Sequence, residues 1–253
     1  GPFWTSLAER VAERADRHPP LHLALIAHGF GKVACRAEGQ PLLEGPLADA
    51  ALASLAGFQP RQLACLLDGF ALAGCLGRED LIGAVLEEYI RLSSVGGFKR
   101  QQMMSRVLFS LVLEKPALLA DAPPSWQAML SRVQHAPQHA PRRSYHSELE
   151  LCARALCLRA KSQRRKGPYV ADLHVTPPTS TPALAVHLAA EAELCPLTGE
   201  LLGPTRLRQR HLSRMHWTHL WMRRKDWLAL PNTEARVDAL EALVAPHVAT
   251  RRR

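Results

Sequence analysis

The sequence has few aromatic residues, no closely spaced pair of cysteines and no long apolar run. Phe, Trp and Tyr make up 6% of its 253 residues, and the abundance of Leu and Ala favours helix over strand. The six cysteines include no CxxC pair and no nearby histidine at ligand spacing, which argues against a zinc site. No apolar stretch approaches the roughly 18 residues that span a bilayer. We therefore expect a helix-rich globular protein with no metal, no cofactor, no membrane segment and no small-molecule substrate.

The net charge is +9, and the excess of cations lies entirely in the second half of the chain. Residues 1–138 contain 13 Lys and Arg against 13 Asp and Glu, whereas residues 139–253 contain 19 against 10. This asymmetry predicts that a polyanion, RNA or DNA, meets the second half of the protein. A solvated basic surface without a ligand would give the same excess.

The first half has the periodicity of consecutive amphipathic helices. Apolar residues recur every three or four positions, and breaks such as Pro19-Pro20 separate one run from the next. The expected helices cover residues 3–18, 21–36, 47–56, 60–76, 78–92, 99–114, 125–133 and 147–163. Almost none of this half has the alternating pattern of a strand.

An internal repeat with an offset of 40 residues lies within these helices. The segments 23–34 and 63–74 share the pattern Leu-Ala-x-x-x-x-Gly-Phe, and a weaker echo follows around Phe109. Periods of this size are typical of paired helices that stack into a solenoid. Gly29 and Gly69 would let the helices approach closely, while the Phe after each glycine fills the layer between them. An ordinary helical bundle with similar Leu spacing would produce much of this pattern.

Two polar stretches separate the halves. Residues 134–147 read QHAPQHAPRRSYHS, a composition that predicts a linker or an exposed loop. Residues 159–166, RAKSQRRK, are expected to end the following helix with a basic turn. Arg164, Arg165 and Lys166 are candidate phosphate contacts, although cations near a helix C-terminus also complement its dipole. The expected organisation is a helical repeat domain over 1–133, a linker and connecting basic helix over 134–166, and a small α/β domain over 167–253.

The last third of the chain changes to a mixed pattern. Residues 169–175, 184–190 and 217–222 alternate like strands, while residues 205–216 and 234–244 have the periodicity of helices. The order strand, strand, helix, strand, helix predicts a small α/β sandwich. The expected fold class is therefore α plus α/β, with a solenoid-like helical domain followed by this sandwich.

The segment 204–230, PTRLRQRHLSRMHWTHLWMRRKDWLAL, resembles the RAP domain. It has an Arg-rich helix of the type Leu-Arg-x-Arg-x-Leu, an aromatic residue entering the next strand, and Trp227 before a final helix. The resemblance covers residues 167–248. RAP domains occur mostly in organelle proteins that handle RNA, usually behind helical repeats, and the repeat described above looks like those repeats. The resemblance implies an organellar RNA-binding protein.

RAP domains are in turn similar to restriction-endonuclease-like nucleases, which hold a divalent metal with acidic groups on two adjacent strands. Asp172 in the first expected strand matches one such acid. Family members commonly carry Glu-x-Asp-Gly on the second strand, and the matching positions here are His187, Ala189 and Ala190. Alanine cannot bind a metal, and histidine is a poor ligand for magnesium. We therefore expect no catalytic residues; Glu191 or Glu193, slightly further along, could supply the second acid only through a shift of register.

RNA contact does not require catalysis. Arg206, Arg210 and Arg214 recur every four residues, which places three guanidinium groups on one face of the helix. Arg208 falls on the apolar stripe and should point toward the sheet or into the remnant of the nuclease cleft. A further basic group follows Trp217 and Trp221, whose rings could stack on bases or pack in the core. Its members are Arg223, Arg224 and Lys225.

Three functional hypotheses follow. The leading one is a non-catalytic RNA-binding protein that forms a structural part of the mitochondrial ribosome, contacting rRNA through its basic half and other ribosomal proteins through its helical half. The second is an organellar endonuclease that processes RNA, or a factor that stabilises rRNA or mRNA. The third is a protein-interaction scaffold with an incidental basic surface. A plastid is the alternative location to the mitochondrion.

Overall fold

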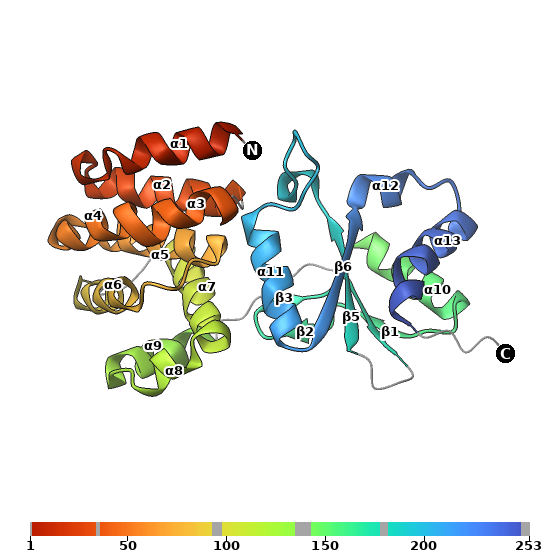
Figure 1. The fold of residues 1–253 in the computed structure, drawn as a ribbon. Helices are drawn as coiled ribbons and strands as arrows, with labels where there is room; N and C mark the ends of the chain where they lie inside the picture. The colour runs from red at the N-terminus through yellow and green to blue at the C-terminus, as the bar shows by residue number, and fades with distance from the viewer. Residues whose placement is uncertain (1, 34–35, 93–97, 135–142, 178–181, 249–253) are drawn as a thin grey trace. The chain divides into compact units, whose positions relative to one another are not determined.

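The computed structural model describes residues 2–33, 36–92, 98–134, 143–177 and 182–248. Within these ranges the chain is mostly helical, with a mixed four-stranded sheet in its C-terminal part (Figure 1). Packing divides the chain into two compact units, Gly1–Ala136 with Leu202–Leu207 and Pro137–Leu201 with Arg208–Arg253. We call them the helical unit and the sheet unit. The expected combination of a helical first part and a C-terminal part with a small sheet is confirmed.

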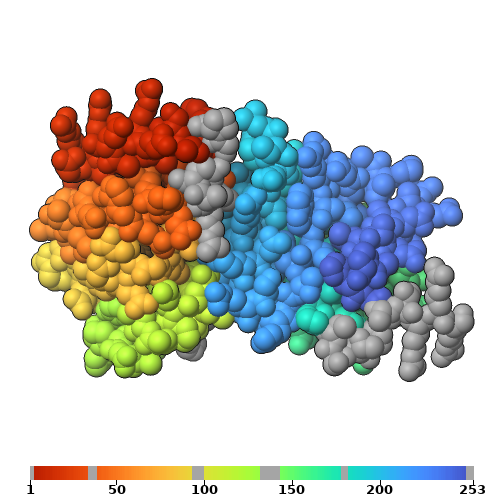
Figure 2. All heavy atoms as spheres, viewed as in Figure 1, coloured from red at the N-terminus to blue at the C-terminus, as the bar shows by residue number. Residues whose placement is uncertain are grey.

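The helical unit consists of helices that follow one another in space as they do in sequence, as the colour order from red to green shows in Figure 2. Its α-helices are α1 (Pro2–Ala12), α2 (Pro20–Val33), α3 (Arg36–Leu42), α4 (Ala48–Ala53), α5 (Pro60–Ala73), α6 (Glu79–Leu92), α7 (Phe98–Glu114), α8 (Pro116–Ala120) and α9 (Pro124–Gln134). Short helical turns of other types are η1 (Ala15–Arg17), η2 (Leu43–Leu47) and η3 (Leu55–Gly57).

Local chemistry explains where the longer helices begin and end. Helix α5 begins at Pro60, whose fixed φ suits a first turn, and the Gln59 N–H donates to Gln62 Oε1 at 2.8 Å. The helix ends at Ala73 because Gly74 adopts a left-handed φ of 76°. The expected end at residue 76 is therefore three residues too far along the chain.

The short helices α3 and α8 are not among the predicted ones. Helix α3 contains Pro41, and α8 begins at Pro116. Prolines in short segments indicate breaks more readily than helices, so periodicity alone does not find such elements. After α3 the chain bends at Gly45, whose φ of −114° and ψ of −110° are not helical.

The two copies of the repeated pattern lie in α2 and α5, which pack directly against each other. A Cβ at Gly69 would collide with the backbone of Ala27 and His28, so glycine is required for this approach. The partner on α2 is Gly31, where a Cβ would collide with the carbonyl oxygen of Gly69, whereas Gly29 has open space around it. The prediction of a close approach at glycine is confirmed for Gly69 and wrong for Gly29.

Aliphatic side chains from α2 and α4 to α7 form the core of the helical unit. Phe30, Phe70 and Trp126 are buried among them. No helix in the described part of the chain is both long enough and apolar enough to cross a membrane.

The sheet unit contains a four-stranded sheet in the order β1-β4-β5-β6, in which β5 and β6 are parallel and the other neighbours antiparallel. Its strands are β1 (Arg159–Ser162), β2 (Arg165–Lys166), β3 (Tyr169–Val170), β4 (Leu173–Thr176), β5 (Ala183–Ala189) and β6 (Trp217–Arg223). Its helices are α10 (Ser144–Ala155), α12 (Arg224–Ala229) and α13 (Thr233–Val244), with the turns η4 (Glu191–Glu193) and η5 (Ala245–His247). Helix α11 (Gly203–Arg214) belongs to it from Arg208 onward, and the residues of α11 before Arg208 belong to the helical unit. Strands β2 and β3 form a separate hairpin.

Helices cover both faces of this sheet (Figure 1). Leu184 and Val186 of β5 pack in a core with Leu240 of α13 and residues of α10. Ala185, which points to the other face, packs with Leu212 of α11. Alternate residues of a strand point to opposite faces, so the period-2 pattern of residues 183–189 places α11 opposite α10 and α13.

The basic run 159–166 is not the end of a helix. Helix α10 ends at Ala155, and after Cys157, whose φ is 54°, residues 159–162 form β1 and pair with β4. Gln163, with a φ of 52°, then turns the chain into β2. The expected helix over 147–163 is therefore wrong in its second part, because pairing with the edge of the sheet outweighs helix propensity there. Residues 135–142 of the expected linker lie outside the described residues.

Candidate nucleic-acid interface

The β2–β3 hairpin carries the first group of predicted phosphate contacts. Arg164 precedes the hairpin, and Arg165 and Lys166 form β2. Gly167 in the following turn has a left-handed φ of 56°, a conformation that favours glycine. Arg164 and Arg165 are exposed, and Lys166 is half-buried. The turn therefore presents two guanidinium groups to solvent from a defined backbone.

The hairpin packs beside α11 and the start of β6 (Figure 1). Tyr169 Oη lies 2.6 Å from His211 Nδ1 of α11, within hydrogen-bond distance. Lys166 Nζ lies 5.7 Å from the ring centroid of Trp217, and the centroid of that ring lies 4.6 Å from that of His174. Cations of the hairpin and of α11 therefore lie on the same side of the sheet unit.

Helix α11 carries the second group, Arg206, Arg210 and Arg214. Helical geometry places these residues on one face, about 6 Å apart along the axis. Leu212, on a different face, is buried in a small apolar cluster with Trp217 and holds the helix against the sheet. Arg210 is half-buried and Arg214 is exposed.

The cations of the hairpin create a positive field around His174 of β4. Burial lowers the pKa of His174, and the charges of Arg164 and Lys166 lower it further. The same field attracts an approaching anion. We define the basic surface as Arg164, Arg165, Lys166, Arg210 and Arg214.

The third predicted group lies at the other end of β6. This strand has 7 residues, which corresponds to about 20 Å, and Arg223 is its last residue. Arg224 Nη2 donates to the carbonyl oxygen of Leu188 at 3.1 Å, and Lys225 Nζ lies 3.4 Å from Glu191 Oε2. The predicted contact residues therefore do not form one continuous surface, and the contact of Arg224 links β5 to α12.

The tryptophan rings pack mainly in the protein interior. Trp217 is 8% exposed and Trp227 is fully buried. Trp221 is half-buried beside Leu194 and Leu201. Of the two interpretations that the sequence allowed, core packing is correct for Trp217, and little of its ring is accessible for stacking on a base.

Arg208 points into the sheet unit. Its Nη1 lies 3.0 Å from His187 Nδ1, and its Nη2 donates to the carbonyl oxygen of Val170. The prediction that this arginine turns toward the sheet is confirmed. The guanidinium of Arg208 therefore makes contacts inside the protein.

Asp172, immediately before β4, is the centre of the polar group that Arg208 joins. Its Oδ1 accepts a hydrogen bond from His146 Nε2 at 3.0 Å. Its Oδ2 accepts from His187 Nδ1 at 2.9 Å and from the Leu188 N–H at 2.8 Å. Burial raises the pKa of Asp172, but hydrogen bonds from His187, His146 and the Leu188 amide outweigh it and hold the pKa well below its usual range. The carboxylate is therefore ionised.

His187 lies between two carboxylates. Its Nδ1 faces Asp172, and its Nε2 lies 3.1 Å from Glu193 Oε1. An ionised carboxylate only accepts hydrogen bonds, so both ring nitrogens carry protons and His187 is an imidazolium. The Arg208 guanidinium, 3.0 Å from the same Nδ1, is then a second cation beside the ring and not a hydrogen-bond donor to it. Burial lowers the pKa of His187, but the bonds to Asp172 and Glu193 outweigh it and raise the pKa.

Glu193 is held ionised in the same way. Burial raises its pKa, but the hydrogen bond and charge of His187 lower it to about 2. Its Oε2 also accepts from the Ala190 N–H at 2.7 Å. We call Asp172, His187, Glu193 and Arg208 the buried charge cluster. Two carboxylates are balanced there by an imidazolium and a guanidinium, which is the condition under which buried charges are tolerated.

The sequence left open whether Glu191 or Glu193 supplies a second acid beside Asp172, and the structure places these two glutamates in different settings. Glu193 reaches the cluster from η4, whereas Glu191 is exposed and pairs with Lys225. Asp172 and Glu193 do not converge on an open point, because both bond the ring of His187. Among the described residues, no group of three His, Cys, Asp or Glu side chains is arranged to hold a metal ion.

Sequence reasoning missed two histidines of this site. His146 was expected in the linker, but α10 begins at Ser144 and buries it. Its Nδ1 accepts from the Arg143 N–H at 2.9 Å, so its proton is on Nε2, which donates to Asp172. A helix start at Ser144 would have predicted this inward position, but the Pro- and His-rich residues before it indicated a loop.

The second missed histidine is His219 of β6. It is 6% exposed, its ring lies 5.9 Å from that of His187, and neither ring nitrogen has a hydrogen-bond partner within the described ranges. Burial lowers the pKa of His219 to about 3, with the charges of Arg208 and His187 adding to the effect. His219 is therefore neutral. His219 stands two residues after Trp217 in the expected strand, so the two side chains share a face of the sheet. That spacing was the signal in the sequence for its inward position.

Comparison with models of known protein families gives no match, and comparison with curated proteins gives none either. The likeness to RAP domains therefore depends on the motif residues between Thr205 and Leu230. It stays a prediction.

Proposed function

We propose that the chain is a non-catalytic RNA-binding protein of the RAP-domain type that forms a structural part of the mitochondrial ribosome and contacts rRNA. The observation that carries this proposal is the basic surface, in which cations from a hairpin and from a helix lie on one side of the sheet unit. Guanidinium groups bind phosphate oxygens through paired hydrogen bonds, so such a surface suits a nucleic-acid backbone.

The distribution of charge supports a division of roles. Residues 1–138 are charge-balanced, with 13 cations and 13 anions, whereas residues 139–253 have 19 against 10. Phosphate contact is therefore assigned to the sheet unit, and contact with other ribosomal proteins to the helical unit. The packing of the two similar segments in α2 and α5 is compatible with a repeat-type helical unit.

The buried charge cluster supports a non-catalytic role. A metal-dependent nuclease needs carboxylates that face an open position for the ion and its water. Here Asp172 and Glu193 bond the imidazolium of His187, and Asp172 is also bonded by His146 and the Leu188 amide. Freeing both carboxylates would break several buried charge-assisted hydrogen bonds, each worth about 1.5–3 kcal/mol.

The proposal is tested by sedimentation of the tagged full chain with mitochondrial ribosomal subunits, after mild nuclease treatment that removes mRNA. The test variant carries Arg164→Glu, Arg165→Glu and Arg214→Glu, and the control carries Arg10→Glu, Arg14→Glu and Arg17→Glu, all at exposed positions. We expect the parent and the control to sediment with a subunit and the test variant to stay at the top of the gradient. Equal sedimentation of the two variants, or a parent that does not sediment with either subunit, contradicts the proposal.

A cleavage assay tests the non-catalytic part separately. The purified chain is incubated with structured rRNA and either magnesium or manganese, and we expect no cleavage above that of the Asp172→Ala variant. Metal-dependent cleavage that this substitution abolishes would identify an endonuclease instead.

A further inference from the structure

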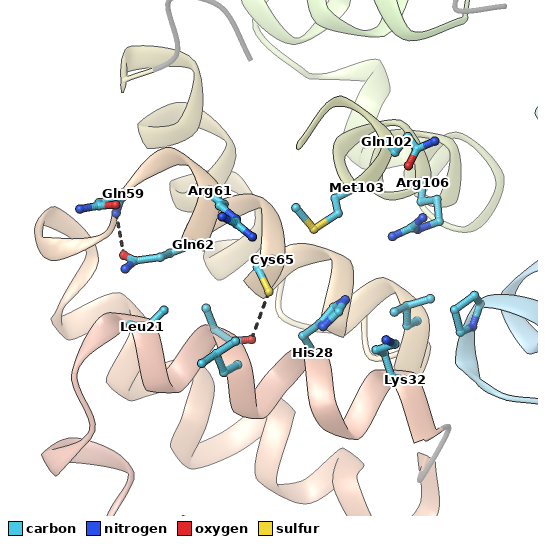
Figure 3. Close-up of a pocket in the computed structure, with 14 residues that line it drawn as sticks. Leu21, His28, Lys32, Gln59, Arg61, Gln62, Cys65, Gln102, Met103 and Arg106 are labelled. Atoms are coloured by element: carbon cyan, nitrogen blue, oxygen red, sulfur yellow. Dashed lines mark hydrogen bonds between the residues drawn. The ribbon is translucent and has the colours of Figure 1, made fainter. Parts of the chain in front are cut away.

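Helices α2, α5 and α7 lie side by side and form the walls of a groove (Figure 3). Cys65 Sγ donates to the carbonyl oxygen of Ala24, and Arg106 bonds Asp68, so residues separated by 41 and 38 positions meet. These separations are close to the 40-residue repeat, so the three helices present equivalent positions along one surface. The groove has a volume of about 920 Å³.

Apolar side chains line the groove from two opposite sides. Leu21 and Leu25 of α2 are 47% and 53% exposed, and both line the groove. Met103 from α7 faces the same space from the opposite side (Figure 3). Single exposed leucines are common on protein surfaces, but two that share a concave lining with a methionine form a binding surface for apolar side chains.

The rim of the groove is positively charged. Lys32, Arg61 and Arg106 contribute to the lining, and the lining contains no Asp or Glu among the described residues. Asp68 lies fully buried beneath it, where its carboxylate is paired with Arg106 at 2.8 and 2.6 Å and with His28 at 3.3 Å. This pairing fixes the side chain of Arg106 at the groove, although it also offsets part of its charge.

Amide side chains complete the lining. Gln59, Gln62 and Gln102 contribute to it, and the Oε1 of Gln62 accepts from the Gln59 N–H, which fixes one of these amides. A glutamine amide both donates and accepts, so it matches the N–H and C=O groups of an extended peptide backbone. Leu21 and Lys32 are 11 residues apart on α2, about 16 Å along the axis, which is the length of about five extended residues.

We propose that this groove binds an extended acidic peptide in which carboxylates alternate with aliphatic side chains. Aliphatic side chains contact Leu21, Leu25 and Met103, carboxylates pair with Lys32 and Arg61, and the glutamines bond the peptide backbone. Single-stranded RNA is less suited, because bases stack on aromatic rings and the described lining contains no Phe, Tyr or Trp. The inference deepens the protein-contact role assigned to the helical unit but does not depend on RNA binding by the sheet unit.

The test uses the purified full chain and three fluorescein-labelled probes. The first is a seven-residue peptide in which Glu and Leu alternate, the second has Lys in place of Glu, and the third is a seven-nucleotide oligo(U). Anisotropy titrations near physiological salt compare the parent with Leu25→Asp and Arg61→Glu. Two control variants, Leu151→Asp on α10 and Arg14→Glu beyond α1, make the same changes at exposed positions outside the groove.

We expect the Glu–Leu peptide to bind saturably, the other two probes not to bind at this site, and each groove variant to weaken binding by about tenfold or more. The two control variants should bind as the parent does, and circular dichroism should give all five proteins the same melting temperature. Failure of the Glu–Leu peptide to bind, equal binding of the Lys–Leu peptide, or equal losses in groove and control variants overturns the proposal. Oligo(U) that displaces the peptide would instead make the groove an RNA site. Substitutions in the basic surface should leave peptide binding unchanged, which separates this result from the RNA proposal.

Discussion

Neutralising the basic surface should reduce the salt dependence of RNA binding by a calculable amount. Arg164, Arg165 and Arg214 are exposed, so replacing all three with Gln removes charge without disturbing the core. For single-stranded RNA, the logarithm of the association constant falls with the logarithm of salt concentration by about 0.7 per phosphate contact. If each arginine makes one contact, the slope should become less steep by about 2.

The same relation gives the loss of affinity at each salt concentration. Near 0.15 M monovalent salt, three contacts contribute about 1.7 to the decimal logarithm of the association constant, so the variant should bind RNA about 50-fold more weakly there. Near 0.05 M the difference should widen to about 500-fold, because more free energy is gained from counterion release at low salt. The ratio of affinities therefore changes with salt in a defined direction.

Fluorescence anisotropy with one labelled single-stranded RNA, titrated at several salt concentrations, measures both quantities. The matched control carries Arg10→Gln, Arg14→Gln and Arg17→Gln, which remove the same charge from the helical unit. An unchanged slope in the test variant, or the same change of slope in the control, refutes the assignment of phosphate contacts. A large loss of affinity with an unchanged slope would mean that these arginines act on the fold and not on phosphates.

Two further predictions concern stability. Gly69→Ala places a Cβ against the α2 backbone and should lower the free energy of unfolding by about 1–3 kcal/mol. Gly29→Ala, with open space around it, should be neutral or stabilising by up to about 1 kcal/mol. Chemical denaturation that ranks the two variants the other way contradicts the packing described. His219 has a folded pKa of about 3, below its unfolded value, so its contribution to stability is present above about pH 6.5 and is lost as pH falls. From pH 7 to 5 this loss is about 2 kcal/mol. Between pH 7 and 5, the free energy of unfolding of the His219→Phe variant should fall by about 2 kcal/mol less than that of the parent. Denaturation curves with equal pH dependence for variant and parent would refute the burial of a neutral ring.

Periodicity predicted the long helices of the first half well, because each has an apolar face that recurs over three or more turns. The helices α2, α5, α6 and α7 lie within a few residues of the predicted ranges. Short helices next to proline, such as α8, have too few turns for a periodic signal. The close approach of α2 and α5 was predictable from the paired glycines, but the choice of Gly31 over Gly29 depends on the crossing geometry of the two helices.

The candidate site was less predictable than the fold. The row of arginines on α11 and the inward direction of Arg208 follow from helical spacing alone. Strand β1 was missed because residues 159–162 have no alternating apolar pattern and form a strand only by pairing with β4. The buried charge cluster brings together Asp172, His187 and Glu193 from three elements, and no local pattern encodes a meeting of that kind.

The identity of residue 187 explains how the charges of the cluster balance one another. A glutamate at this position would place a third carboxylate beside Asp172 and Glu193, with Arg208 to balance them. Such a group would carry a formal charge of about −2 in a buried site, where uncompensated charge costs several kcal/mol, and a divalent cation would relieve it. Histidine changes the local charge by two, because a carboxylate is replaced by an imidazolium, and the four groups then sum to zero. The histidine at position 187 therefore lets Asp172 and Glu193 stay ionised beside each other, because its ring is bonded to both of them.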